Sequence, residues 1–410
     1  MRLQSPGGVR TCTRFAGVFS VFVMAWTIWS TAATAAPLLS SGFETDPAPA
    51  GWTLGAFGRQ APDGQWRQTD GRHCLTVNRG YWQSPPIEVA PFGYYRVVFQ
   101  ALAPAGGHFT AVFFDEAGSE LVADNYDGID AAPAWQTVTS CVRAHALARH
   151  MRLRFVAADG ALSVDDVLVE GCDAAAVLRW ADDLAAGLPP VKFQPPPDRW
   201  KLLPRTIARL RQGPSLRVVM LGDSIVNDTS NSIFEVLLER AWPRCRIEVV
   251  TSVRGGTGCQ FYQAEDRVRS YVLAFEPDLL IIGGISHGYD TDAIRSVIRQ
   301  VRAGSDCEIL LMSGAVCPQH RCDENFLKHS GLPREKALAL ISSFPERLMR
   351  LAADEQVELL DMRSAWDVYI AASPRPLEWF MRDPIHANRR GKQVLGRIIE
   401  RYFLPDDVRR

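Results

Sequence analysis

The chain has 410 residues, of which 47% are apolar and 22% are charged, and its formal net charge is -1. This length leaves room for two or three domains with sizeable cores, and the composition excludes a mainly disordered chain. The balanced charge gives no sign of the basic surface that nucleic-acid binding requires, and it indicates no partner by itself.

The first 35 residues have the organisation of a secretory signal. Arg2, Arg10 and Arg14 precede an apolar run at 15–29, and small residues follow as far as Ala35. This order predicts a signal peptide over 1–35, cleaved after Ala35, so that the mature protein is secreted or periplasmic and free of the membrane. The alternative is an uncleaved anchor, although the run is shorter than the roughly 20 residues that a spanning helix needs.

The cysteines are consistent with export. There are nine, of which Cys12 would leave with the signal. The remaining even set in an oxidising compartment predicts disulfides without defining their pairing, although Cys317 and Cys322 could close a short loop. No CxxC motif is present, and the wide spacing argues against a structural zinc site.

Residues 38–172 predict an all-β domain. In the segment 151–156, Met151, Leu153 and Phe155 alternate with arginines, which places one face of a strand on a core and the other in water. A stretch of this length suits a jelly roll or a similar β-sandwich. Further strand-like segments, separated by Gly, Pro and Asp clusters, lie at 94–100, 108–115 and 135–142.

A helix is expected at 173–187 and a stiff Pro-rich linker at 188–198, so we expect 173–199 to separate the β domain from a second domain at 200–410. In this second domain apolar runs alternate with amphipathic patterns, which predicts a three-layer α/β domain around a parallel sheet. Its site should lie at the carboxyl ends of the strands. Strands are expected at 216–221, 247–250, 279–282, 309–312 and 357–360, and helices at 231–240, 262–275, 290–302, 334–353 and 389–403.

Two short motifs lie at opposite ends of this α/β pattern. Gly222-Asp223-Ser224 closes the first strand, where a glycine permits a tight turn and a following helix can direct N–H groups at an anion. A serine in a turn or at a helix N-cap would fit this motif equally well. Before the last helix, however, Asp383 lies three residues ahead of His386, a spacing that lets the carboxylate orient an imidazole whose other nitrogen faces the serine.

Together these motifs resemble the first and last blocks of SGNH (GDSL-type) hydrolases, over roughly residues 200–405. The resemblance implies a flavodoxin-like three-layer domain that acts as a serine esterase without a required cofactor. It implies that Ser224, Asp383 and His386 form the catalytic triad. It also implies an oxyanion hole made by the Ser224 N–H, a glycine after the second strand and an asparagine after the third.

The oxyanion hole is where the sequence departs from the family pattern. Gly255 best matches the family's glycine, and Gly256 is the alternative. After the third strand, 283–287 lacks the expected Gly-x-Asn. Counted from the strand, His287 takes the asparagine's place, and its imidazole N–H could donate to an oxyanion. Ser286 is the other candidate, and His287 as a polar loop residue without a catalytic role is the remaining interpretation.

The β domain resembles the jelly roll of carbohydrate-binding modules in Gly42-Phe43-Glu44 and in 163–169. Acidic residues of the corresponding strands often hold a structural calcium there, which implies a calcium site at Glu44 and Asp166, because carboxylates suit a hard cation. Two solvated acids on adjacent strands are the alternative. Rings that could stack on a sugar are supplied by Trp52, Trp66, Tyr81, Trp82 and Trp135.

These features lead to the hypothesis of a secreted esterase that removes acyl groups, above all acetyl, from a carbohydrate through an acyl-enzyme, while the sandwich holds the polymer or frames the cleft. No redox or nucleotide cofactor is implied, and the expected partner is an acylated carbohydrate, not a nucleic acid. Two alternatives remain: an O-acyltransferase with the same triad, and a carbohydrate-binding protein with weakened catalysis.

Overall fold

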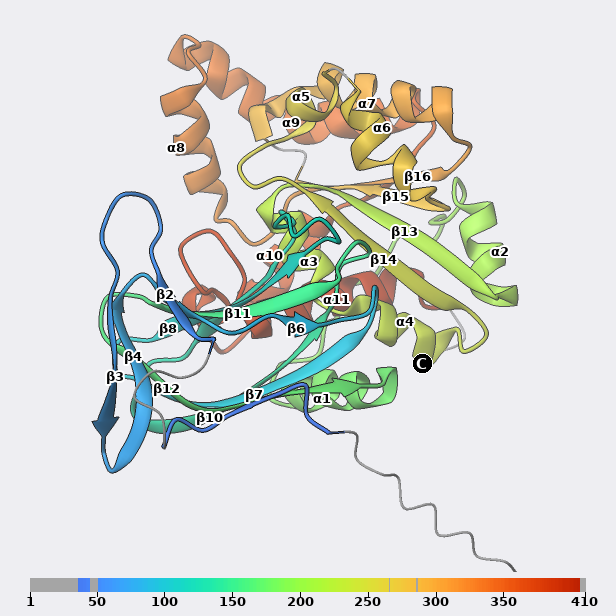
Figure 1. Cartoon of the computed structure of the whole chain (residues 1–410). Coiled ribbons are helices and arrows are strands. Elements are labelled where there is room, and N and C mark those ends of the chain that lie inside the picture. The colour runs from blue at the N-terminus through green and yellow to red at the C-terminus, as the bar shows by residue number, and fades with distance from the viewer. Residues whose placement is uncertain (1–35, 45–50, 265, 285–286, 406–410) are drawn as a thin grey trace, which may run out of the picture. The chain divides into compact units, whose positions relative to one another are not determined.

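The computed structural model describes residues 36–44, 51–264, 266–284 and 287–405 (Figure 1), and only the backbone of His287, Gln319, His320 and Cys322. The predicted signal peptide at 1–35 and the alternative oxyanion residue Ser286 therefore lie outside the described residues. Within the described ranges, no helix has the length and apolar character needed to cross a membrane.

The first half of the chain forms two antiparallel sheets. Their strands are β1 (Leu39–Ser41), β2 (Thr53–Gly55), β3 (Asp63–Thr69), β4 (Arg72–Arg79), β5 (Tyr81–Gln83), β6 (Ile87–Glu88), β7 (Tyr94–Ala103), β8 (Gly107–Phe114), β9 (Asn125–Ile129), β10 (Ala132–Arg143), β11 (His150–Ala157) and β12 (Leu162–Cys172). One sheet has the order β10-β7-β12-β4-β3 with β1 on β12, and the other has the order β2-β5-β11-β8-β9 with β6 on β11. Strand β9 is therefore an edge strand of its sheet.

The two antiparallel sheets enclose one core. Met151, Leu153 and Phe155 of β11 are 0% exposed and pack in the same cluster as Val97 and Phe99 of β7, which belongs to the other sheet. The alternation predicted for this strand is confirmed. Burial of such side chains stabilises the fold by about 1.5 to 3 kcal/mol each, which is why one face of each sheet is apolar.

The second half of the chain holds a parallel sheet of β13 (Ser215–Gly222), β14 (Arg246–Val253), β15 (Leu279–Ile282), β16 (Glu308–Met312) and β17 (Glu358–Leu360). The strand order is β14-β13-β15-β16-β17, and every neighbouring pair is parallel. All five strands overlap the predicted ones, so the prediction of a parallel sheet is confirmed. The order reverses direction around β13, and in open α/β sheets such a switch point is where ligands bind.

Helices cover both faces of the parallel sheet, because successive residues of a buried strand point to opposite sides. Val218 and Met220 of β13 belong to one apolar cluster, and Val219 and Leu221 to another. Figure 1 shows α5, α6, α7 and α9 on one side and α3, α4, α10 and α11 on the other. The helices are α1 (Ala174–Ala186), α2 (Pro204–Gln212), α3 (Ser224–Ser230), α4 (Phe234–Ala241), α5 (Cys259–Tyr262), α6 (Arg267–Tyr271), η1 (Leu273–Phe275), η2 (His287–Tyr289), α7 (Thr291–Gly304), α8 (Gln319–His329), α9 (Arg334–Asp354), α10 (Met362–Ala372), η3 (Leu377–Phe380) and α11 (Arg389–Phe403).

Two sequence-based expectations differ from this structure. The helix expected at 262–275 is replaced by the short elements α6 and η1, because Val272 between them leaves the helical conformation (φ -128°, ψ -62°) and is 0% exposed. Disulfides were expected, yet Cys74, Cys141, Cys172, Cys245, Cys259 and Cys307 are free thiols. The short loop that Cys317 and Cys322 could close involves the side chain of Cys322, which lies outside the described residues.

His145 joins the loop after β10 to the parallel sheet. Its Nε2 donates to the Thr251 carbonyl of β14 at 3.0 Å, and its Nδ1 accepts from the Leu147 N–H at 3.1 Å. One ring nitrogen donates and the other accepts, so the arrangement requires a neutral imidazole. Burial, opposed by the hydrogen bond to Thr251, lowers the pKa of His145 to about 4.

This lowered pKa predicts a loss of stability in mild acid. An unfolded histidine takes up its proton near pH 6.5, so the contribution of neutral His145 is complete above that pH and is lost as the pH falls toward 4. The shift corresponds to about 3 kcal/mol. Denaturant unfolding between pH 7 and 4 should give a smaller decrease for His145→Gln than for wild type, and equal decreases would contradict this role.

Candidate active site

Ser224 lies at the carboxyl end of the central strand. Strand β13 ends at Gly222, and Ser224 is the first residue of α3. The N–H groups of this first turn have no acceptor within the helix. The Asp223 carboxylate caps the helix by accepting from the N–H groups of Ile225 (2.9 Å) and Val226 (3.2 Å). This cap holds the start of α3 against the strand and leaves the half-buried Ser224 side chain at the edge of the sheet.

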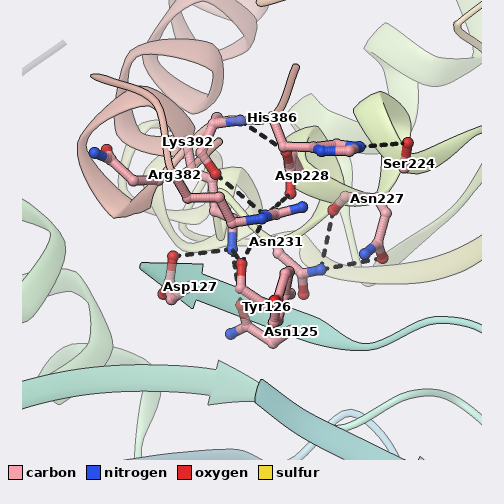
Figure 2. A network of polar contacts seen from close by, with 12 residues as sticks. Asn125, Tyr126, Asp127, Ser224, Asn227, Asp228, Asn231, Arg382, His386 and Lys392 are labelled. Carbon is pink, nitrogen blue, oxygen red and sulfur yellow. Dashed lines mark hydrogen bonds and ion pairs between the residues drawn. The ribbon is translucent and has the colours of Figure 1, made fainter. Parts of the chain in front are cut away.

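The structure brings the three predicted triad residues together (Figure 2 shows Ser224 and His386). The Oγ of Ser224 lies 2.8 Å from Nε2 of His386, and Nδ1 of His386 lies 2.9 Å from each carboxylate oxygen of Asp383. The three residues come from α3 and from the loop between η3 and α11. With this geometry the imidazole can take the proton of the serine hydroxyl, while the carboxylate orients the imidazole.

Asp383 is held in its ionised form. Besides His386 Nδ1, it accepts from the N–H groups of Ile385 (2.8 Å) and His386 (3.0 Å). Burial opposes ionisation, but the hydrogen bonds from His386 and Ile385 and the charges of His386 and Arg382 outweigh it and lower the pKa of Asp383 to about 2. The carboxylate is therefore negative across the neutral range and can stabilise a protonated imidazole.

The candidate oxyanion residues lie after the ends of β14 and β15. Gly255 and Gly256 follow β14 in an exposed turn, and a Cβ added at either position would meet nothing within 4 Å. The Arg254 N–H donates to the carbonyl of Gly222 at 3.0 Å, which ties this turn to the end of β13. Of the residues after β15, His287 begins η2 with its side chain outside the described residues.

A cavity of about 480 Å³ opens beside Ser224. Its walls include Tyr289, Phe326 and Ile385, and its polar lining includes Arg321 and Arg363. Sequence reasoning missed α8 and α10, which supply Phe326 and the two arginines. A signal for α10 was present, because its buried residues recur at i, i+3, i+4 and i+7, namely Met362, Ala365, Trp366 and Tyr369. The cavity is large enough for a small-molecule ligand and lies next to Ser224.

Gly284 packs directly against the cap of α3. Its φ is +58°, and an added Cβ would lie 2.4 Å from the carboxylate atoms of Asp223, which is 1% exposed. A side chain at this position is therefore strained by the backbone and blocked by a buried charged group.

We expect Gly284→Ala to destabilise the protein by roughly 2 kcal/mol or more and to slow any reaction at Ser224, because the displaced Asp223 no longer caps α3. Gly171→Ala is the matched control, since an added Cβ there meets nothing within 4 Å. Thermal unfolding of both variants measures the difference. Equal stability of the two would show that Asp223 moves without cost.

The acids proposed to hold calcium already have cationic or imidazole partners. Arg72 Nη1 lies 3.0 Å from Asp166 and 3.2 Å from Asp165, and His73 Nδ1 lies 2.8 Å from Glu44. Among the described residues no group of three or more His, Cys, Asp or Glu could hold a metal ion. These side chains do not fit a shared calcium site, because Glu44 is bound by an imidazole and Asp166 by a guanidinium.

The two antiparallel sheets with their shared core, residues 39–172, are called the sandwich, and its aromatic residues are not freely exposed. Trp52 is buried, and Trp66, Tyr81, Trp82 and Trp135 are half-buried. Trp66 and Trp82 donate from their indole nitrogens to the carbonyls of Phe43 (2.8 Å) and Thr76 (3.0 Å). Trp52, Trp66 and Trp82 contribute to the core between the two sheets.

Comparisons with known proteins find similarities only among solved structures, and these are weak. No protein-family model and no curated protein matches the chain. It is similar to a catalytic mutant of Axe2, an acetylxylan esterase from Geobacillus stearothermophilus, at 14% identity and a TM-score of 0.37 over 48% of this chain and 99% of that one. A two-domain esterase (CEX) active on acetylated mannans matches at 18% identity and a TM-score of 0.37, over 50% of this chain and 52% of that one. The active domain of bacteriophage CBA120 tailspike protein 4 matches at 13% identity and a TM-score of 0.26, over 30% of this chain and only 20% of that one.

Proposed function

We propose that this protein is an exported serine esterase of SGNH type that removes acyl groups, above all acetyl, from a carbohydrate. The observation that carries the proposal is the continuous hydrogen-bonded chain from Ser224 through His386 to Asp383. The parallel strand order β14-β13-β15-β16-β17, which is the flavodoxin-like order, supports it together with the two sequence motifs. In this proposal residues 1–35 direct export and are removed, and the two antiparallel sheets form a jelly-roll-like domain.

In the proposed reaction, Ser224 Oγ attacks the ester carbonyl carbon and gives its proton to His386 Nε2. As the bond to the sugar oxygen breaks, His386 returns the proton to that oxygen, and the acyl group remains on Ser224. Water then attacks the acyl-enzyme, His386 takes its proton, and the proton passes to Ser224 Oγ as the acid is released. Asp383 orients the imidazole and stabilises its charge throughout.

The negative oxygen of each tetrahedral intermediate needs hydrogen-bond donors. The Ser224 N–H at the start of α3 is the first of these, and Gly255 supplies the second, with Gly256 as the alternative. His287 takes the place of the asparagine, with Ser286 as the alternative. The exposed turn at 254–256 is tied to the carbonyl of Gly222, which supports a glycine N–H as a donor close to the serine.

The cavity beside Ser224 supports a small polar substrate. Its volume of about 480 Å³ is in the range of small-ligand sites. Aromatic and aliphatic walls suit the faces of a sugar ring and an acyl methyl group, and Arg321 and Arg363 offer donors to sugar oxygens. An acyltransferase with the same triad remains the second candidate, because a sugar hydroxyl could replace water in the second step.

Acetate release from acetylated xylan, pectin, chitin and peptidoglycan fragments tests this function. We expect release from at least one polymer by wild type and none by a Ser224→Ala variant. Mass analysis of the products with an added unacetylated saccharide separates hydrolysis from transfer, since transfer labels the acceptor. Absence of both acetate and labelled acceptor with every substrate would contradict the proposal.

A further inference from the structure

The edge strand β9 of the sandwich lies against the loop that carries Asp383 and His386 (Figure 2). The Tyr126 carbonyl in this strand accepts from Arg382 Nη1 at 2.8 Å and from Lys392 Nζ at 2.7 Å. An unpaired edge normally exposes its backbone groups to water or to another chain. Here two cations from the α/β half of the chain bind the Tyr126 carbonyl of this edge.

Both cations are almost completely buried. The Arg382 side chain is 4% exposed and the Lys392 side chain is 3% exposed. Lys392 also donates to Asn125 Oδ1 (3.0 Å) and to Asp127 Oδ1 (3.1 Å). Burial of such charges is costly unless every one is paired, so this interface is defined by specific contacts and tolerates little displacement.

Arg382 is connected to both ends of the short loop that contains Asp383 and His386. Its Nη1 donates to Asp228 Oδ1 at 2.7 Å, and Asp228 Oδ2 accepts from the Ala387 N–H at 2.9 Å. The Arg382 N–H donates to the carbonyl of His386 at 2.9 Å. The guanidinium also lies 4.5 Å from the centre of the Tyr126 ring. The residues on either side of the Asp383–His386 segment are therefore fixed to α3 and to the sandwich.

The segment of chain that leads into β9 also contacts the helix of the nucleophile. Asn227 of α3 and Asn231, the C-cap of that helix, donate to the Asp124 carbonyl at 2.9 and 2.8 Å, and Asn227 also donates to the Asp124 carboxylate at 3.1 Å. One segment of the sandwich, 124–127, thus contacts both the helix that carries Ser224 and the loop that carries His386. It can set the distance between the two reacting side chains.

We propose that the sandwich is a positioning element of the active site, in which residues 124–127 act through Arg382 and Asn227 to hold His386 at hydrogen-bond distance from Ser224. This inference rests on the proposed esterase function. Loss of hydrogen-bond alignment by about 1 Å can lower a rate by about 100-fold without weakening substrate binding. Substitutions of Arg382 or Asn227 are therefore expected to lower kcat and to leave KM nearly unchanged.

Steady-state hydrolysis of p-nitrophenyl acetate by Arg382→Met, Arg382→Lys and Asn227→Ala tests the proposal, with kcat referred to the active sites titrated by a fluorophosphonate. We expect a decrease in kcat of about 100-fold for Arg382→Met and about tenfold for Asn227→Ala, with KM within about twofold of wild type. Arg382→Lys should recover part of the loss. Because Arg382→Met leaves buried Asp228 without its partner and could fail to fold, Asn227→Ala is the variant that decides in that case.

Arg96→Met is the matched control, since Arg96 pairs with Glu170 on a solvated face of the sandwich and is 47% exposed. It should leave kcat unchanged. If Arg382 and Asn227 variants have normal kcat per titrated site and only reduced stability, the sandwich has a purely structural role and the inference is wrong. Absence of activity in wild type would instead refute the proposed function, so the two failures are distinguishable.

Discussion

Replacing Ser224 with alanine is expected to lower kcat for p-nitrophenyl acetate by about 10⁴-fold or more, because no acyl-enzyme can form without the hydroxyl. His386 Nε2, now 2.8 Å from an empty position, would have only water to deprotonate. The fold should be unaffected, since Asp223, and not Ser224, caps α3.

Spectrophotometric assay of purified enzyme measures this loss, and circular dichroism verifies the fold. Ser342→Ala, on an exposed position of α9, is the matched control and should retain full activity. Turnover by Ser224→Ala within tenfold of wild type would remove Ser224 from the reaction.

The second large effect concerns stability. Arg143 of β10 and Glu235 of α4 form an ion pair whose side chains are 4% and 0% exposed. Arg143 Nη2 also donates to the carbonyl (3.2 Å) and hydroxyl (3.0 Å) of Ser230. Arg143→Met should lower the free energy of unfolding by about 3 to 5 kcal/mol, because it leaves the Glu235 carboxylate buried without its cation.

A double-mutant cycle separates the pair from the surrounding packing. Removal of both charges in Arg143→Met/Glu235→Leu should recover much of the stability lost in the single variant, because the uncompensated buried charge is then absent. Urea unfolding of the two single variants, the double variant and wild type measures the coupling. Strictly additive losses would show that the two side chains contribute independently.

Local signals account for what could be predicted from the sequence. Apolar runs such as 216–221 and 279–282 predicted β13 and β15, because a strand buried on both faces must be apolar throughout. The Asp383-x-x-His386 spacing is also local, so the mutual contact of the two side chains could be expected. Their approach to Ser224 was inferred from the resemblance to a known family.

The contacts that were missed are those between distant segments. Lys392 and Asn125 are 267 residues apart, and nothing in either local sequence indicates that a buried lysine will bind an edge strand. A lysine within an amphipathic helix is normally solvated, so periodicity could not predict its burial. The contact of Arg72 with Asp166, one acid of the proposed calcium site, likewise joins segments 94 residues apart and could not be read from either one alone.

Intact-mass analysis after incubation with a fluorophosphonate determines whether Ser224 is the nucleophile of an acyl-enzyme. We expect one adduct per chain, located on Ser224 by peptide mapping, absent from Ser224→Ala and formed far more slowly in His386→Ala. An unlabelled wild type, or an adduct that persists in Ser224→Ala, would show that Ser224 is not the nucleophile.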